Sequence, residues 1–219
     1  MILLIDTTTE TALVALANEG KIIAQKNNSQ QKNHAAFIHP AIQELLNQNN
    51  IQINQLRGVL VTEGPGSYTG IRVGLASAKG ICLALNLPLM MVNRLYAMAL
   101  ASKQAHPLDI GFYIPMIDAR RLEVFYAVFN ASLTEITPPS HLILSENSFS
   151  NLLENNPVVF TGSGCEKFYQ ISNHKNIIRL PELNLANELA LISKQMMAQE
   201  KWTNIVDAQP FYSKDFYNG

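Results

Sequence analysis

Short apolar runs separated by polar turns open the chain, and this pattern predicts β-strands. The runs cover residues 2–6, 12–16 and 21–26, and Asn18-Glu19-Gly20 gives a turn signal between the second and the third. Two strands joined by so few residues pair in antiparallel fashion. The chain is therefore expected to begin with a three-stranded antiparallel meander.

Two longer stretches repeat their apolar residues with the spacing of an α-helix. In residues 33–49 the repeat runs through Ile38, Ala41, Ile42, Leu45 and Leu46. In residues 69–85 one stripe consists of Ile71, Leu75, Ala78, Cys82 and Leu85, and further apolar residues occupy other faces. A helix that is apolar on more than one face is buried on several sides. We therefore predict two helices, the second of them extensively covered.

The rest of the chain alternates between strand and helix patterns. Strands are predicted for residues 58–62, 88–92, 110–117, 122–129 and 158–161. Helices are predicted for residues 95–103, 146–154 (with Ser145 as N-cap) and 185–199, and a loop for residues 131–140. This alternation is typical of the α/β class. We predict two lobes, residues 1–105 and 106–219, with the tail 205–219 as a candidate to pack back on the first.

The composition narrows the classes of protein that remain. Among 219 residues, Lys and Arg sum to 16 and Asp and Glu to 17, so the formal net charge is −1. Side-chain amides number 33, as many as the charged residues, so much of the polar surface is neutral. This balance does not supply the basic surface that electrostatic nucleic-acid binding needs. A hydrophobic content of 47% argues against a disordered chain.

Cysteine usage and hydropathy indicate the compartment. Cys82 and Cys165 are the only cysteines, so neither a disulfide framework nor a metal cluster is expected, and a reducing compartment is the simpler interpretation. No run approaches the roughly 20 apolar residues of a membrane span. Residues 1–6 lack the basic flank of a secretory signal. We therefore expect a cytoplasmic protein that does not associate with membranes.

Three loops are candidates for nucleotide binding. They contain Asp6, Thr7 and Thr8 after the first strand, Gly64, Gly66 and Ser67 before the second helix, and Gly162, Ser163 and Gly164 after a late strand. Glycines between a strand and a helix N-terminus offer free N–H groups to an anion. The alternative is that all three are tight turns, because neither a Walker A motif nor a dinucleotide fingerprint is present.

Other groups that could carry chemistry are few. None of the five histidines pair at the i, i+4 spacing that places two imidazoles on one helical face to hold zinc. Asp118, Arg120, Arg121 and Glu123 surround a hairpin turn whose two basic side chains could grip an anion, although a solvated turn is the simpler interpretation. The residues alone therefore indicate a two-lobe nucleotide-binding scaffold with little catalytic chemistry.

Longer motifs resemble the TsaB (YeaZ) family. Ile-Asp-Thr-Thr-Thr-Glu at residues 5–10 resembles the opening of that family. Gly-Pro-Gly-Ser-Tyr-Thr-Gly-Ile-Arg-Val-Gly-Leu at residues 64–75 resembles its central signature. Ile-Asp-Ala-Arg at residues 117–120 resembles its second block, and Pro210-x-Tyr212 its tail. The resemblance covers nearly the whole chain.

This resemblance implies a two-lobe actin/Hsp70-like (ASKHA) fold in which each lobe is a mixed sheet flanked by helices. It implies a non-catalytic subunit of the machinery that makes N6-threonylcarbamoyladenosine beside the tRNA anticodon, where the chain binds and stabilises a TsaD-like catalytic subunit. Further implied partners are a TsaE-like ATPase reached through the complex, a second copy of the chain when it is alone, and tRNA mainly through the catalytic partner. No cofactor is required, and ATP or ADP at or near the partner interface stays open.

The resemblance also assigns the first two helices to partner and dimer contacts. The residues that we single out there are His34, Ile38, Ile42, Leu45, Tyr68, Ile71, Arg72, Leu75, Lys79 and Cys82. The alternative is that these apolar stripes only cover the protein's own sheet. Each helix has more apolar faces than one sheet needs, so we expect both interpretations to hold in part.

The histidine pair of the catalytic relatives has no counterpart in this chain. In TsaD relatives an Asn-His-x-x-x-His motif holds the metal, and Arg94 and Met98 stand at the two histidine positions here. Neither side chain coordinates a hard metal ion usefully, so we expect no metal site and no catalytic residue. Two alternatives stay open, a metal-dependent glycoprotease-like peptidase and a small-molecule kinase of the same superfamily. The missing histidines argue against the first, and Thr7 in place of a phosphate-loop glycine argues against the second.

Overall fold

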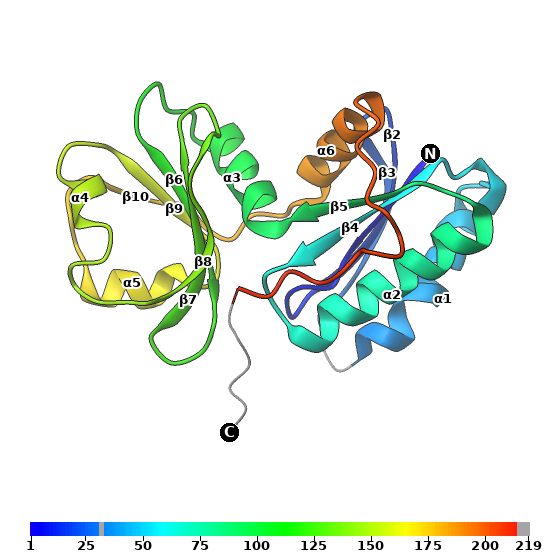
Figure 1. The fold of residues 1–219 in the computed structure, drawn as a ribbon, viewed down its shortest axis with the longest axis horizontal. Coiled ribbons are helices and arrows are strands. Elements are labelled where there is room, and N and C mark those ends of the chain that lie inside the picture. The colour runs from blue at the N-terminus through cyan, green and yellow to red at the C-terminus, as the bar shows by residue number, and fades with distance from the viewer. Residues whose placement is uncertain (31–32, 214–219) are drawn as a thin grey trace. The chain divides into compact units, whose positions relative to one another are not determined.

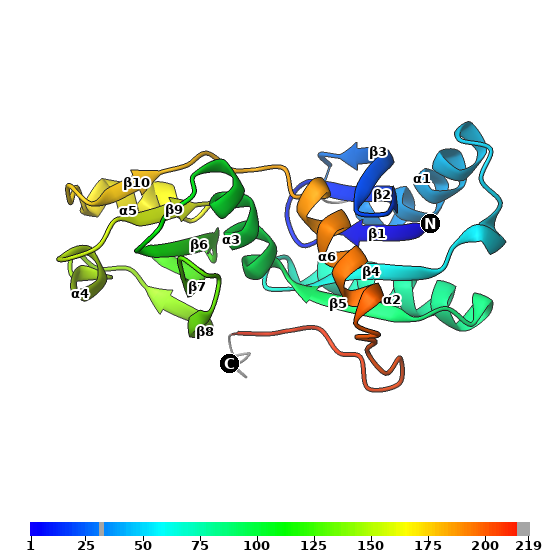
Figure 2. The same cartoon turned by 90° about the horizontal axis from the view of Figure 1, so that it is seen from above.

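The structure is a computed structural model that describes residues 1–30 and 33–213. The chain divides into two compact units. The first unit consists of residues 1–94 and 186–211, and the second of residues 95–185 and 212–219, of which residues 214–219 lie outside the described part. Each unit is built on a five-stranded sheet with helices packed against it (Figures 1 and 2).

The sheet of the first unit contains the predicted meander. It consists of β1 (Ile2–Asp6), β2 (Ala12–Asn18), β3 (Lys21–Asn28), β4 (Gly58–Gly64) and β5 (Leu89–Asn93) in the order β3-β2-β1-β4-β5. β2 pairs with β1 and β3 in antiparallel fashion, whereas β1, β4 and β5 run parallel. The central strand β1 is buried along its whole length, because helices cover the sheet on both faces.

Three long helices cover this sheet. α1 (His34–Gln48) and α2 (Tyr68–Leu85) lie side by side on one face, and α6 (Ala186–Ala198) covers the other face (Figures 1 and 2). The Ser67 side chain caps α2 by accepting a hydrogen bond of 3.3 Å from the Gly70 amide. A short 3-10 helix, Ile53–Gln55, leads into β4. No helix among the described residues is long and apolar enough to cross a bilayer.

The structural division differs from the predicted boundary after residue 105. α6 follows the second unit in sequence, yet Leu189, Ala190 and Ile192 are buried and the helix packs on β1, β2 and β3. The segment after α6 also stays with the first unit, because the Phe211 amide donates to the Glu63 carbonyl at 2.8 Å. Helix periodicity reveals that α6 is amphipathic, but it does not reveal which of two sheets the helix covers.

The second unit has the sheet order β10-β9-β6-β7-β8. Its elements are α3 (Arg94–Ala105), β6 (Phe112–Asp118), β7 (Glu123–Asn130), β8 (Glu135–Ile143), α4 (Ser150–Leu153), β9 (Val158–Thr161), α5 (Cys165–Ile171) and β10 (Ile177–Arg179). β6 pairs with β7 antiparallel and with β9 parallel, so this sheet is mixed as well. The predicted α/β class with two lobes, each a mixed sheet flanked by helices, is therefore confirmed.

Two predictions for the second unit are wrong. Residues 131–140 were predicted as a loop, but β8 runs through Pro138 and Pro139. β8 is an edge strand, where a missing backbone N–H is tolerated because it can face away from the ladder. The helix predicted for residues 146–154 shortens to α4, because Phe149 adopts a left-handed conformation at φ 64°. Ser145 does not cap it; its amide donates instead to the Ser148 hydroxyl at 2.9 Å.

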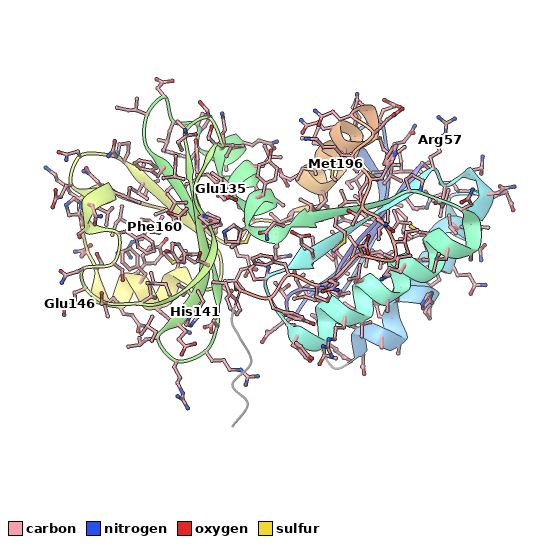
Figure 3. The ribbon with its side chains drawn as sticks, in the orientation of Figure 1. Arg57, Glu135, His141, Glu146, Phe160 and Met196 are labelled. Atoms are coloured by element: carbon pink, nitrogen blue, oxygen red, sulfur yellow. The ribbon has the colours of Figure 1, made fainter. Side chains whose placement is uncertain are left out.

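Aromatic rings fill the core of the second unit. Phe160 on β9 is fully buried (Figure 3) and packs against Phe168 at a centroid distance of 4.9 Å. Phe149 approaches both rings edge-on, at 5.7 Å and 5.5 Å. Aromatic pairs in this arrangement contribute beyond their buried area. The left-handed residue that shortens α4 thus also anchors the core.

Removing the Phe160 ring is expected to destabilise the second unit strongly. Phe160→Ala leaves a cavity in a packed core and should cost about 3–5 kcal/mol of unfolding free energy. Ile136→Ala on β8, where the side chain is 51% exposed, should cost less than about 0.5 kcal/mol. Urea denaturation followed by far-UV circular dichroism measures the unfolding free energy of both variants. Equal losses of stability in the two variants would contradict this description of the core.

Candidate functional site

The C-terminal ends of the parallel strands β1, β4 and β5 meet at one edge of the first unit's sheet. β1 ends at Asp6, β4 leads into the glycine-rich loop at residues 64–67, and β5 leads into Arg94. Open α/β sheets place their ligand sites at this edge. Most of the predicted nucleotide-binding residues of the first unit are gathered here.

A buried ion pair occupies the centre of this edge. Arg94 Nη1 is paired with Asp6 Oδ2, and the two side chains are only 8% and 4% exposed. The other carboxylate oxygen accepts hydrogen bonds from the Thr8 hydroxyl at 2.6 Å, the Thr62 hydroxyl at 2.7 Å and the Thr8 amide at 3.0 Å. Both oxygens of Asp6 are therefore engaged within the unit, and its charge is compensated by a guanidinium.

The surroundings of Asp6 change its proton affinity. Burial by itself raises the pKa of this carboxyl, but the Arg94 charge and the hydrogen bonds from Thr8 and Thr62 outweigh burial and hold the pKa below its ordinary value. Asp6 is thus ionised at neutral pH and acts as the structural counter-ion of Arg94. A carboxylate held in this way is not available as a general base.

The glycine-rich loop packs directly on the loop that follows β1. The Ser67 amide donates to the Thr8 carbonyl at 2.7 Å, and the Thr7 hydroxyl donates to the Gly70 carbonyl at 2.7 Å. A Cβ added at Gly66 or Gly70 would approach the Thr8 or Thr7 carbonyl oxygen to well under 3.0 Å. These positions therefore require glycine because backbone meets backbone. In this arrangement Gly66 and Gly70 serve a tight turn, which is the alternative to nucleotide binding given in the sequence analysis.

The first-unit candidates do not fit a bound phosphate as they are arranged. A phosphate needs open space in front of the glycine N–H groups, and the Thr7–Thr8 backbone fills that space at Gly66 and Gly70. The position in which a cation would accompany Asp6 holds the Arg94 guanidinium. No chemical step through a nucleotide is derived for this edge.

The third candidate loop lies in the second unit. Gly162 adopts φ +106°, and a Cβ there would clash with the Met116 carbonyl and the Met98 methyl group. Gly164 is pressed against Val124, and Ser163 accepts a hydrogen bond of 3.2 Å from the Asp118 amide. These residues join β9 and α5 to the β6–β7 hairpin. Met98, which the sequence comparison with TsaD relatives predicted to stand at a metal-ligand position, is a core residue that is 5% exposed.

Most of the predicted interface residues point into the first unit. The buried members, each at most 5% exposed, are His34, Ile38, Ile42, Leu45, Ile71, Leu75 and Cys82. Their stripes cover the protein's own sheet, which is the alternative interpretation, because the period of 3.6 residues directs them all to one side. His34 has a further task, since its Nε2 lies 3.0 Å from the Thr9 carbonyl and ties α1 to the loop after β1. Burial raises the pKa of Cys82 to about 11, so this thiol is unreactive.

The remaining predicted interface residues lie at the surface of α2. Tyr68 is 39% exposed, and the Arg72 guanidinium stacks 4.0 Å above its ring. Lys79 is partly buried and donates to the Ala208 carbonyl at 3.1 Å, which fastens the segment after α6 to this helix. Of the ten residues, Tyr68 and Arg72 are the ones that are exposed.

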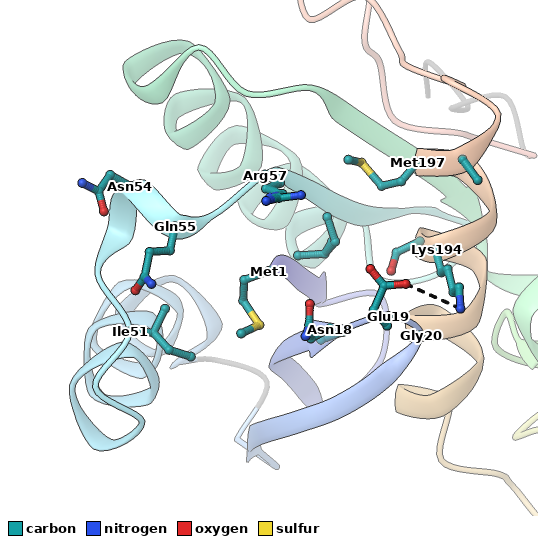
Figure 4. Close-up of a pocket in the computed structure, with 14 residues that line it drawn as sticks. Met1, Asn18, Glu19, Gly20, Ile51, Asn54, Gln55, Arg57, Lys194 and Met197 are labelled. Atoms are coloured by element: carbon teal, nitrogen blue, oxygen red, sulfur yellow. Dashed lines mark ion pairs between the residues drawn. The ribbon is translucent and has the colours of Figure 1, made fainter.

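A cavity of about 790 Å³ opens at the opposite, N-terminal edge of the sheet (Figure 4). It lies between Met1, the segment around Asn54 and the C-terminal half of α6, and Arg57 extends over it (Figure 4). Lys194 at its rim pairs with Glu19 at 3.6 Å. None of the candidate site residues named from the sequence line this cavity, so it is separate from the candidate site.

Sequence reasoning missed how the site is held together. Thr62 was not singled out, and Arg94 was noted as a replacement for a metal ligand but not as the partner of Asp6. A signal was present: an acid ends one buried strand, and an arginine follows another. The pairing depends on the strand order β1-β4-β5, which places both at the same edge.

Breaking the ion pair is expected to destabilise the first unit. Arg94→Met leaves a buried carboxylate without its counter-ion, so the free energy of unfolding should fall by about 3–5 kcal/mol. The double variant Asp6→Asn/Arg94→Met removes both charges and should recover much of that loss. Chemical denaturation measures all three proteins, and an additive double variant would contradict a direct interaction.

Acid should weaken the same interaction. Because the pKa of folded Asp6 lies below its unfolded value of about 3.9, the pair stabilises the fold fully above that value and loses its contribution as pH falls through the folded pKa. The stability difference between wild type and Asp6→Asn/Arg94→Met should therefore shrink below about pH 4. Denaturation curves from pH 7 to pH 2 report this, and a constant difference would contradict it.

Comparison with known proteins gives a consistent family assignment. Residues 21–209 match the family model described as TsaD, tRNA N6-adenosine threonylcarbamoyltransferase. The chain is 31% identical over 180 residues to the tRNA threonylcarbamoyladenosine biosynthesis protein TsaB of Bacillus subtilis, covering 81% of this chain and 74% of that protein.

Solved structures show the same fold. A Pseudomonas aeruginosa protein with similarity to peptidase YeaZ superposes with a TM-score of 0.82 at 20% identity, over 97% of this chain and 99% of that chain. An inorganic polyphosphate/ATP-glucomannokinase from Arthrobacter superposes with a TM-score of 0.52 at 11% identity, over 90% and 98% of the two chains. The fold is thus of the actin/Hsp70-like (ASKHA) type. Since the family model spans most of the chain and the Bacillus relative exceeds 30% identity, the chain belongs to the TsaB (YeaZ) family of tRNA threonylcarbamoyladenosine biosynthesis proteins.

Proposed function

We propose that this chain is a non-catalytic subunit of the machinery that makes N6-threonylcarbamoyladenosine in tRNA, and that it binds and stabilises a TsaD-like catalytic subunit. The relatives named for this pathway support the biological setting. The buried Asp6–Arg94 ion pair favours a non-catalytic role. The C-terminal edge of the parallel strands, where a superfamily enzyme would hold its ligand, is filled here by the chain's own residues.

The surface for the partner is the outer face of the α1–α2 pair. In the first half of α1 and along α2, this outer helix face is made of exposed residues that are mostly small or apolar: Ala35, Ala36, His39, Pro40, Arg72, Ala76, Gly80, Leu83 and Ala84. His39 and Ser77 lie 3.4 Å apart across the two helices, which fixes their relative position. Leu83 is 66% exposed. Such a face is poor in charge and lets another helix approach closely.

Gly80 is the observation that carries this proposal. It lies in the interior of an 18-residue helix, where glycine costs about 1 kcal/mol relative to alanine. A Cβ added there would meet nothing within 4 Å, so packing within the chain gives no reason for glycine. The other glycines of this helix, Gly70 and Gly74, have such a reason in the Thr7 contacts. A partner that approaches the helix backbone at Gly80 supplies the missing reason.

The remaining expectations follow from this arrangement. The same face would pair two copies of the chain when the partner is absent, and a TsaE-like ATPase and tRNA would be reached mainly through the complex. The protein needs no cofactor of its own; a nucleotide, where one is bound, belongs at or near the partner interface rather than at the filled edge around Asp6. Cys82 and Cys165 are buried and form no disulfide, which is consistent with a protein that acts in the reducing cytoplasm.

Substitution at Gly80 tests the proposed face. Gly80→Arg projects a long charged side chain from the centre of the face and should weaken the complex with the TsaD-like subunit by at least about 100-fold, a difference of roughly 2.7 kcal/mol. Isothermal titration calorimetry with the purified partner measures this. Gln195→Arg, a matched change on the exposed side of α6, should leave the affinity unchanged.

A smaller change separates folding from binding. Gly80→Ala should raise the free energy of unfolding by about 0.5–1 kcal/mol, because the helix gains a better residue and nothing obstructs the methyl group. The same variant should bind the partner less tightly than wild type. Full affinity of both Gly80 variants would reject this face as the interface.

A further inference from the structure

The hairpin turn between β6 and β7 presents two adjacent arginines. Arg120 and Arg121 are exposed at its tip, and the turn is closed by hydrogen bonds from the Ala119 amide to the Glu123 carbonyl at 3.0 Å and from the Glu123 amide to the Arg120 carbonyl at 2.9 Å. The Asp118 carboxylate accepts from the Arg120 amide at 2.6 Å. The backbone of the tip is therefore held firmly, while the two guanidinium groups extend into solvent.

The acidic groups beside the tip already contact other side chains. Asp118 contacts Lys167 at 2.8 Å, and Glu123 contacts His141, a residue of β8 (Figure 3), at 2.8 Å. Arg120 and Arg121 form no ion pair with any residue that the structure describes. The tip thus presents two guanidinium groups outside these contacts, in a chain of net charge −1.

The other arginines are used differently. The chain contains six, and the remaining four are Arg57 at the cavity, Arg72 stacked on Tyr68, Arg94 buried with Asp6, and Arg179 stacked on Tyr169 at 4.3 Å. Two of the six arginines of the chain therefore lie side by side on one turn, which distinguishes this turn from the rest of the surface. An arginine guanidinium donates bidentate hydrogen bonds to phosphate oxygens, which a lysine ammonium group cannot do.

The backbone at these two positions is unfavourable for arginine. Arg120 has φ 71° and Arg121 has φ 48°, both in the left-handed region, which costs about 1–2 kcal/mol for a residue with a Cβ. Asn and Gly adopt this left-handed region at lower cost than arginine does. Side chains kept in strained backbone are characteristic of functional positions. The turn therefore holds arginine at two positions where its backbone is strained.

We propose that Arg120 and Arg121 contact the phosphate backbone of the tRNA when the chain acts in its complex. This inference rests on the proposed function, because it takes tRNA as the polyanion that the complex handles. Two arginines provide a local contact rather than a binding surface, which agrees with a chain that is otherwise poor in positive charge. The contact positions the RNA and reads no sequence.

An acidic protein surface is the other class of partner that arginines could fit. The RNA is favoured because the pathway already supplies a polyanion, and because the proposed protein partner is accommodated by the outer helix face, which is poor in charge. The two classes differ in how binding responds to salt and to loss of the arginines. Salt-dependent tRNA binding and calorimetry with the protein partner separate the two.

The test uses the reconstituted complex of the full chain with the TsaD-like subunit. The variant Arg120→Asn/Arg121→Gly installs residues that adopt the left-handed region more readily, and it removes both charges. The control Lys175→Gln/Lys201→Gln removes two exposed charges elsewhere. Fluorescence anisotropy with labelled tRNA gives the affinity at several salt concentrations, calorimetry gives the affinity for the partner, and a melting curve gives the stability.

The arginine variant should melt about 2–4 °C higher than wild type, because backbone strain is relieved. Its complex should form normally but bind tRNA roughly tenfold more weakly, and the dependence of log K on log salt should fall by about 2, one unit for each lost phosphate contact. The control should match wild type in all three measurements.

Unchanged tRNA affinity and salt dependence in the arginine variant would overturn the inference and leave the proposed function intact. Loss of affinity for the protein partner would overturn it in favour of an acidic protein surface. If the wild-type chain itself forms no complex with the TsaD-like subunit, the proposed function fails, and the inference fails with it.

Discussion

The buried ion pair between Asp6 and Arg94 decides what the first unit can do. A lone carboxylate at the end of β1 would be too costly to bury without a cation beside it. Here a guanidinium from the chain takes that role, and threonine hydroxyls complete the hydrogen bonding of the carboxylate. The edge is therefore stable without a ligand. It becomes a structural joint that holds together the ends of β1, β4 and β5.

The glycines of α2 and of the loop before it have two different roles, one in packing within the unit and one at its surface. Gly66, Gly70 and Gly74 bring the helix against the loop after β1, where a methyl group would collide with Thr7 or Thr8. Gly80 points away from the core and meets nothing. The first three positions make the unit rigid; the fourth leaves a smooth outer helix face. A helix anchored from behind in this way can offer its outer side to another protein without itself rearranging.

Much of the fold could be predicted from the sequence, and the failures have physical causes. The meander, α1, α2 and the two-lobe α/β class follow from periodicities that are local in the chain. β8 was missed because Pro138 and Pro139 suggest a loop unless the strand is known to be an edge. The position of α6 was missed because amphipathicity does not say which sheet a helix covers. For the site, apolar stripes such as Ile38–Leu45 were expected to contact a partner in part, but they face inward. The pairing of Asp6 with Arg94 could not be predicted without knowing the strand order of the sheet.

These features describe a protein whose candidate ligand edge is closed by its own arginine. Its outer helix face is the surface that we propose for the catalytic partner. The most direct test is the rate of tRNA threonylcarbamoylation by the TsaD-like subunit, measured with and without equimolar wild-type chain. The account predicts that the catalytic subunit alone is nearly inactive and that adding this chain restores turnover. Full activity of the catalytic subunit in the absence of this chain would contradict it.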